Sequence, residues 1–114
     1  MNISFDGIGQ NVATFLAEDG LSEGQVCKVT ATGTVSACAS GERFCGVVHH
    51  LEEDGAAAVI LAGFVTLPYT GSAPPVGYDK IAAGDGGAAA ANDAGGEYLV
   101  VDVDTENMTV CLYL

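Results

Sequence analysis

The residue types that most often carry catalysis are few in this chain, and their spacing is unfavourable. The two histidines, His49 and His50, are neighbours. Neighbouring residues on a strand point to opposite faces of the sheet, so the two imidazoles cannot hold one metal ion together. We expect one ring to face solvent and the other to pack partly buried, with no catalytic or metal-binding role for either.

The serines offer no activated nucleophile. None of them lies in a Gly-x-Ser-x-Gly motif, and none has a histidine close to it in the sequence. A catalytic serine needs a base that is itself held by a third group. The sequence therefore predicts no enzyme and no catalytic residue.

The acidic residues Asp102, Asp104 and Glu106 alternate as the oxygen ligands of a calcium loop do. The glycine that such a loop needs is absent, and Asn107 follows instead. The segment also lies where a hairpin must turn. We expect a turn with solvated carboxylates and no metal site, although a weak cation site stays open.

The pair Asp79-Lys80 is the dipeptide that carries lipoyl or biotin in small acidic carrier domains. The surrounding residues do not match the carrier hairpin beyond the dipeptide. We expect Lys80 to form surface ion pairs, and we predict no cofactor.

The four cysteines, at positions 27, 38, 45 and 111, lie in apolar runs. They include no Cys-x-x-Cys pair, and Cys38 and Cys45 lack histidines at zinc-finger spacing. Cysteine behaves as a small hydrophobic residue when it is not oxidised. We expect buried thiols rather than disulfides or a zinc site.

The charge excludes several partners. Fifteen acidic residues oppose three basic ones, Lys28, Arg43 and Lys80, for a net charge of −12. Nucleic-acid binding requires clustered lysines and arginines, so neither nucleic acid nor an anionic membrane is an expected partner. No positively charged leader precedes Lys28, and the longest apolar stretch, 56–67, is shorter than the roughly 20 residues of a membrane span. We expect a soluble chain without an export signal.

The apolar residues form short β-branched runs separated by Gly, Asp and Asn. The expected strands are 25–30, 34–37, 44–51, 56–62, 64–69, 76–83, 97–104 and 108–114, while 11–18 is a strand or one helical turn. This pattern predicts an all-β fold of about eight to ten short strands, a small β-barrel or a β-sandwich, with no substantial helix. Residues 1–10 are expected to be a flexible N-terminal arm, and residues 11–114 a single β domain.

Glycines mark three expected features of the chain. Gly46 lies inside an apolar strand and indicates a bulge or a close backbone approach. Gly63 separates two apolar runs that are either buried on both faces or sharply bent between them. The low-complexity segment 84–96 is rich in glycine and alanine. We expect it to be a mobile hairpin tip that buries little apolar area, with at most a poor strand at 88–91.

From residue 24 to the end the chain carries a series of short motifs: GQVCKV at 24–29, TGTV at 32–35, RFCGVV at 43–48, GAAAV at 55–59, GFVTLPY at 63–69, VGYDK at 76–80 and EYLVVD at 97–102. The order of these motifs resembles that of the capsid cement, or head decoration, proteins of tailed bacteriophages. Each motif alone is common hairpin sequence, and their order is more specific.

The resemblance implies a structural protein on the outside of the virion, made in the bacterial host cytoplasm. It implies that the chain binds the major capsid protein, commonly as a homotrimer, and stabilises the head. The expected capsid or subunit contacts are Ile3, Phe5, Tyr69, Pro74 and Pro75. The alternative is a small acidic β module that binds a glycan or a cation or carries a covalent cofactor.

Overall fold

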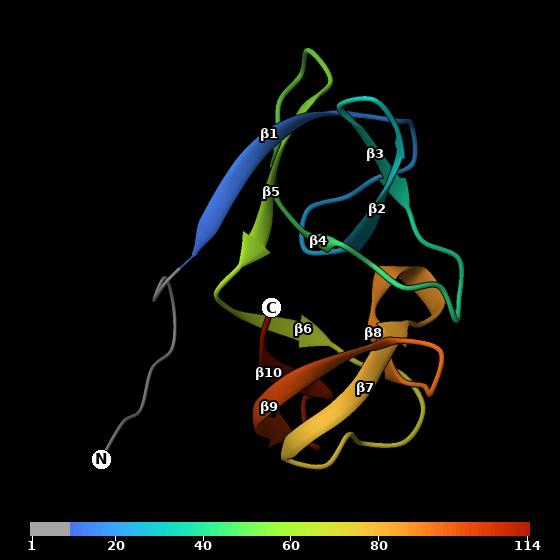
Figure 1. Ribbon diagram of the computed structural model, residues 1–114, viewed down its shortest axis with the longest axis vertical. Helices are drawn as coiled ribbons and strands as arrows, with labels where there is room; N and C mark the ends of the chain where they lie inside the picture. The colour runs from blue at the N-terminus through green and yellow to red at the C-terminus, as the bar shows by residue number, and fades with distance from the viewer. Residues whose placement is uncertain (1–9) are drawn as a thin grey trace.

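The computed structural model describes residues 10–114 of the chain. The predicted N-terminal arm, with its expected contacts Ile3 and Phe5, lies outside the described residues except for Gln10. The described part is all-β, as predicted, and its strands fall into two groups (Figure 1). It contains no helix long and apolar enough to cross a membrane.

Residues 10–114 contain ten strands and one short 3₁₀ turn. They are β1 (Asn11–Ala17), β2 (Val26–Ala31), β3 (Thr34–Ala37), β4 (Gly46–Leu51), β5 (Ala56–Ala62), β6 (Phe64–Pro68), β7 (Gly77–Ala83), η1 (Asp85–Gly87), β8 (Ala89–Ala91), β9 (Gly96–Asp104) and β10 (Thr109–Tyr113). The ambiguous run 11–18 is therefore a strand. The expected hairpins β2–β3 and β9–β10 are both present.

The first five strands form a closed barrel in the order β1-β3-β2-β4-β5. Antiparallel pairing of β1 with β5 closes it, and β1 also runs parallel to β3. A cluster of buried residues fills the barrel interior and includes Cys27, Val35, Val48 and Val59. The barrel therefore has its own apolar filling.

The last five strands form an open sheet in the order β6-β10-β9-β7-β8. The chain passes from the barrel to this sheet at Gly63, which has a φ of 109°. A Cβ at that position would lie 2.6 Å from Cα of Gln10, and an L-residue would also strain such a backbone. Of the two alternatives for this segment, burial on both faces or a sharp bend, the bend at Gly63 is present.

The main core joins the barrel to the sheet. It contains Val26, Val47 and Ile60 from the barrel and Leu67, Val100, Val110 and Leu112 from the sheet, with Phe44 among them. Phe44 lies in the connector between β3 and β4 and is 2% exposed. Its ring stacks on that of Tyr98, with the ring centroids 5.2 Å apart. The two sheets thus share one hydrophobic core.

The alanine- and glycine-rich segment 84–96 differs from its prediction. Ala88 and Ala89 are 6% and 0% exposed, and β8 pairs with β7. A Cβ on Gly95 would clash with the backbone of Ile81. The expectation that this segment buries little is wrong, because residues with little or no side chain let it pack directly against β7.

The cysteines only partly match their expected burial. Cys27 is buried, Cys38 and Cys111 are half-buried, and Cys45 is exposed. Cys45 precedes β4 and lies in the connector rather than in a strand, so its side chain is not held in the core. The expectation of a buried thiol is wrong at this position.

Candidate docking surface

The two histidines lie on the barrel surface and are both exposed. The register of β4 against β5 shifts between Val48 and His50, so the simple alternation that would bury one ring is broken, and the predicted partial burial is wrong. His50 contacts carboxylates through both nitrogens: Nδ1 lies 2.9 Å from Oε2 of Glu23, and Nε2 lies 3.2 Å from Oε1 of Glu52. The backbone N–H of Leu51 also donates to Glu23 and, more than His50, holds the pKa of that carboxyl below its ordinary value.

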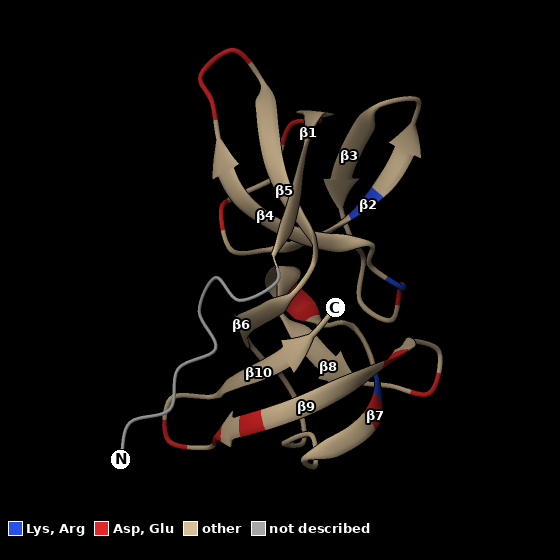
Figure 2. Ribbon diagram, turned by 60° about the vertical axis from the view of Figure 1, so that its left-hand side comes forward, with Lys and Arg blue, Asp and Glu red and all other residues tan. Residues whose placement is uncertain are grey.

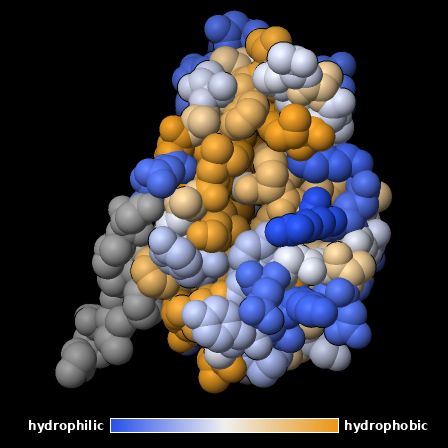
Figure 3. Space-filling view, in the orientation of Figure 1, coloured by the Kyte–Doolittle hydropathy of each residue, from blue (hydrophilic) through white to orange (hydrophobic). Residues whose placement is uncertain are grey.

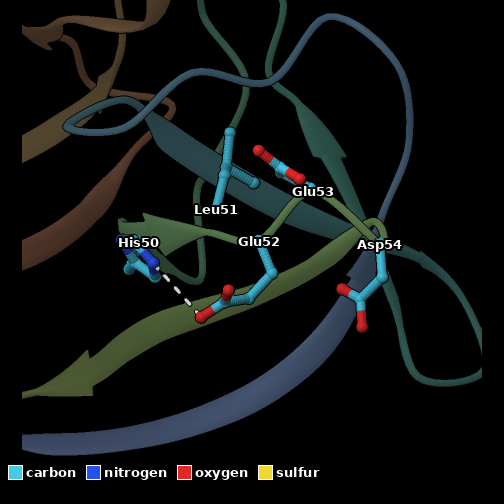
Figure 4. Close-up of a pocket in the computed structure, with 5 residues that line it drawn as sticks. All are labelled: His50, Leu51, Glu52, Glu53 and Asp54. Atoms are coloured by element: carbon cyan, nitrogen blue, oxygen red, sulfur yellow. Dashed lines mark ion pairs between the residues drawn. The ribbon is translucent and has the colours of Figure 1, made fainter.

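The hairpin between β4 and β5 forms a shallow hollow of about 540 Å³. It is lined by five consecutive residues, and Figure 4 shows their side chains pointing in different directions around the turn. Among residues 10–114, no group of three or more His, Cys, Asp or Glu side chains is placed to hold a metal ion. The hollow is therefore the outside of an acidic turn, one of several turns where carboxylates gather (Figure 2).

The segment with alternating acids forms the β9–β10 turn. Oδ1 of Asp104 accepts hydrogen bonds from the backbone N–H groups of Glu106 and Asn107, at 3.0 and 3.2 Å. Oδ2 accepts from Nδ2 of Asn107 at 2.8 Å. The hydrogen bonds from Asn107 hold the pKa of Asp104 below its ordinary value. These contacts match the predicted turn, since the carboxylate is used to fix the turn backbone.

Lys80 lies inside strand β7 and is exposed. Its cross-strand partner in β9 is Glu97, an opposite charge that favours the pairing. A covalent cofactor would have to be displayed from the middle of a sheet rather than from a hairpin tip. The geometry therefore gives no support to the carrier alternative at this residue.

The clearest ion pair of the described residues joins the β2 strand to the connector before β4. Nζ of Lys28 lies 2.7 Å from both carboxylate oxygens of Glu42, and the backbone N–H of Ala39 donates to the same carboxylate at 2.6 Å. Lys28, and then Ala39, hold the pKa of Glu42 below its ordinary value. The pair is partly exposed, so solvent screens it.

Glu42→Gln should lower the urea midpoint of unfolding at neutral pH. A carboxylate whose folded pKa lies below its unfolded value stabilises the protein above the unfolded pKa, and that contribution is lost as pH falls through the folded pKa. The difference between variant and parent should therefore shrink below about pH 4, where glutamates titrate. Urea titrations over a pH series measure it, with Glu53→Gln on the exposed turn as the control. A pH-independent difference would assign the effect to packing instead.

The expected contacts in the β6–β7 loop are only partly available. Tyr69 is 5% exposed and Pro74 is also buried, whereas Pro75 is exposed. Tyr69 forms an isolated bridge with Ala89, and its backbone N–H donates to the carbonyl of Met108 at 3.0 Å. These bonds hold Tyr69 in the main core, so it does not offer the surface contact expected of it.

A row of large apolar side chains crosses the outer face of the second sheet. Strand register places Phe64 beside Tyr113, Tyr113 beside Leu99, and Leu99 beside Tyr78. We call these four residues the aromatic row. Tyr78 is 72% exposed and Tyr113 43% exposed, while Phe64 and Leu99 are half-buried.

Two rings of the aromatic row pack on each other, and polar residues border the row. The Phe64 and Tyr113 rings meet edge to face, with centroids 5.0 Å apart. The cross-strand pair Lys80–Glu97 lies on one side of the row, and Cys111 opposite Asp102 lies on the other. An apolar centre with a polar border is the arrangement of protein-binding surfaces, in which tyrosine is enriched.

A second apolar surface lies on the barrel. Val12 and Leu16 point outward from β1 and are 51% and 62% exposed. Neither β1 nor β5, which pairs with it, contains a charged residue, and Figure 2 shows both strands without charge. Figure 3 shows hydrophobic residues gathered over the same two strands. We call this surface the barrel strip.

No protein-family model matches the chain, and a search of the curated proteins found no match.

Proposed function

We propose that this chain is a structural, non-enzymatic decoration protein of a tailed bacteriophage, which binds the outer surface of the major capsid protein lattice and stabilises the head. The order of motifs from residue 24 onward supports the family. The single structural observation that carries the proposal is the aromatic row, an exposed apolar surface on a rigid sheet face.

The aromatic row suits a large, flat partner better than a small ligand. It crosses four strands, β6, β10, β9 and β7, and so offers a flat surface rather than a cleft. Tyrosine and phenylalanine bury a large area at low entropic cost, because they have only two side-chain torsions. On a capsid the same contact is repeated across the lattice, and a homo-oligomer that binds several subunits at once gains affinity from multivalency.

The charge of the chain determines where copies can meet. Each copy carries a net charge of −12, so copies repel wherever their acidic turns face one another. The barrel strip lacks charged residues on both of its strands. Electrostatic repulsion between two copies is therefore weakest when they meet at this strip. We therefore assign the subunit contact of the proposed trimer to the barrel strip, and sedimentation velocity, which measures oligomer mass, is its check.

Replacing Tyr78 and Tyr113 with serine should weaken binding to undecorated expanded capsids at least tenfold. Loss of one interface anchor commonly costs about 2 kcal/mol, and each 1.4 kcal/mol is a factor of ten in Kd. Tyr78 and Tyr113 are 72% and 43% exposed and belong to neither core cluster, so the variant should keep its fold. Co-sedimentation with capsids at increasing protein concentration measures the affinity, and thermal melting checks the fold.

The matched control is Val29→Ser, which removes an exposed apolar side chain, 53% accessible, from the barrel. This control should bind capsids as the parent does. Equal capsid affinity for the tyrosine double variant and the parent would remove the aromatic row from the mechanism. Failure of the parent to bind any capsid would overturn the decoration function and favour a small binding module.

A further inference from the structure

Two cysteines that the proposed function does not use lie side by side in the barrel. Cys27 is in β2 and is 0% exposed, whereas Cys45 lies just before β4 and is exposed. The backbone N–H of Cys45 donates to the carbonyl oxygen of Cys27 at 2.8 Å. The Cys27 thiol donates to the carbonyl oxygen of Gly46, the residue that follows Cys45, at 3.7 Å, and each of the two thiols is the largest cause of the other's pKa shift.

The backbone at this pair already meets the spacing of a disulfide. With standard bond lengths, an N···O distance of 2.8 Å between these residues keeps their Cα atoms within about 7 Å. Disulfides usually join Cα atoms roughly 4.4–6.8 Å apart. Because the two backbones are already hydrogen-bonded at this spacing, a bond between the sulfurs requires rotation of side chains rather than movement of strands.

The environment of Cys45 favours the thiolate. The neighbouring Cys27 thiol is the largest cause that lowers the pKa of Cys45, to about 7. The interaction with Cys45, and then burial, raise the pKa of Cys27, so Cys27 keeps its proton when Cys45 has lost its own. Burial raises the pKa of the nearby Cys38 to about 11.

Solvent reaches Cys45 through a hollow of about 400 Å³ between the barrel and the second sheet. Lys28, Arg43, Phe44 and Tyr98 line it together with Cys45 and Val29. Two of the three basic residues of the chain are in this lining, and no acidic residue is. A small neutral oxidant can enter, whereas the buried Cys27 cannot be reached directly.

We propose that Cys45 is a peroxide-reactive thiolate and that Cys27 resolves the oxidised form into an intramolecular disulfide. The exposed Cys45 and the buried Cys27 lie on neighbouring, hydrogen-bonded segments of the barrel. This role is independent of the proposed capsid function.

The chemistry balances with hydrogen peroxide as the oxidant. The Cys45 thiolate attacks one peroxide oxygen, the O–O bond breaks, and hydroxide leaves, giving a sulfenic acid at Cys45. The hydroxide takes the proton of Cys27. The Cys27 sulfur then attacks the Cys45 sulfur, the S–O bond breaks, and hydroxide leaves to become water with the proton that Cys45 first released. Two electrons pass from the sulfurs to the peroxide, and the products are one disulfide and two waters.

The disulfide would fix the connector that precedes β4 to strand β2. It closes the loop from Cys27 to Cys45, which contains β3. The closed loop lowers the conformational entropy of the unfolded chain and so stabilises the folded state. Oxidation should raise Tm by about 10 °C, given the loop length and the size of the domain. A thiol reductant should reverse the change, because exchange starts at the exposed Cys45 sulfur.

The test treats the full-length reduced protein with a small excess of hydrogen peroxide. The titratable thiols under denaturing conditions should fall from four to two, the intact mass should fall by two hydrogens, and non-reducing peptide mapping should join the Cys27 and Cys45 peptides. Cys45→Ser should slow thiol loss at least tenfold. Cys38→Ser, the matched control from the same neighbourhood, should oxidise at the parental rate.

A second variant separates the two roles. Cys27→Ser should leave Cys45 as a sulfenic acid that dimedone labels, whereas the parent should take up little dimedone because the disulfide forms first. If Cys27→Ser does not fold, the rate comparison between Cys45→Ser and Cys38→Ser still decides the question. A disulfide that maps to Cys38 or Cys111, a linkage between chains, or equal oxidation rates of Cys45→Ser and the parent would overturn the proposal.

Discussion

Phe44→Ala should lower the free energy of unfolding by about 3–5 kcal/mol, the loss typical of a buried phenylalanine. Phe44 is 2% exposed and is among the largest fully buried side chains of the described residues. Its ring stacks on Tyr98 at 5.2 Å and packs in the core that joins the barrel to the second sheet. Since the total free energy of unfolding of a domain is roughly 5–15 kcal/mol, one such cavity removes a large share of the stability.

Urea unfolding followed by far-UV circular dichroism measures the loss. Phe15→Ala is the matched control, because Phe15 is only half-buried and packs against the separate barrel cluster. Phe44→Leu should lose less than Phe44→Ala, because more of the side-chain volume is kept. If Phe44→Ala lost no more than Phe15→Ala, the shared core would not depend on the aromatic stack.

The strands themselves follow from local sequence. The β-branched runs that become β5, β6 and β10 are too short for helices and are bounded by turn residues, so their period and length decide the assignment. Closure of the barrel could not be derived in the same way. It depends on β1 pairing with both β3 and β5, and these contacts join segments far apart in the chain.

The segment 84–96 shows where composition misleads. Its small residues predict weak burial if each side chain is counted for its own area. In the folded chain Ala89 is fully buried, and a Cβ added at Gly84 or Gly95 would clash with Oγ1 of Thr70 or with the backbone of Ile81. Burial of this kind depends on what lies opposite, and a single sequence does not carry that information.

The aromatic row could not be predicted from the sequence for a related reason. Phe64, Tyr78, Leu99 and Tyr113 are visible as apolar residues in strand patterns, but only the register of four strands places them in one row. The sequence favours Tyr69 because it lies in the expected loop 68–77, where a tyrosine can offer a rigid apolar contact. Its bridge to Ala89 places it in the core instead.

Gly46→Ala should destabilise the protein by about 3 kcal/mol, the upper part of the range for overpacking. A Cβ at position 46 would clash with the carbonyl oxygen of Ile60 and lie 2.9 Å from Cγ1 of Val59. The Ile60 carbonyl belongs to β5, which is paired with β4 on one side and β1 on the other, so it cannot move away without breaking the barrel. The close approach that Gly46 indicated in the sequence is therefore the feature under test.

Gly71→Ala is the control for Gly46→Ala. Gly71 has a φ of 77°, and a Cβ there would have no atom within 4 Å. Gly71→Ala should lower the free energy of unfolding by about 1–2 kcal/mol, solely because alanine is disfavoured in the left-handed backbone region. Gly46 does not have a positive φ, so any loss at Gly46 reports steric contact between β4 and β5. Urea midpoints of the two variants distinguish these causes, and a Gly46→Ala variant as stable as the parent would mean that β4 and β5 can separate enough to hold a methyl group.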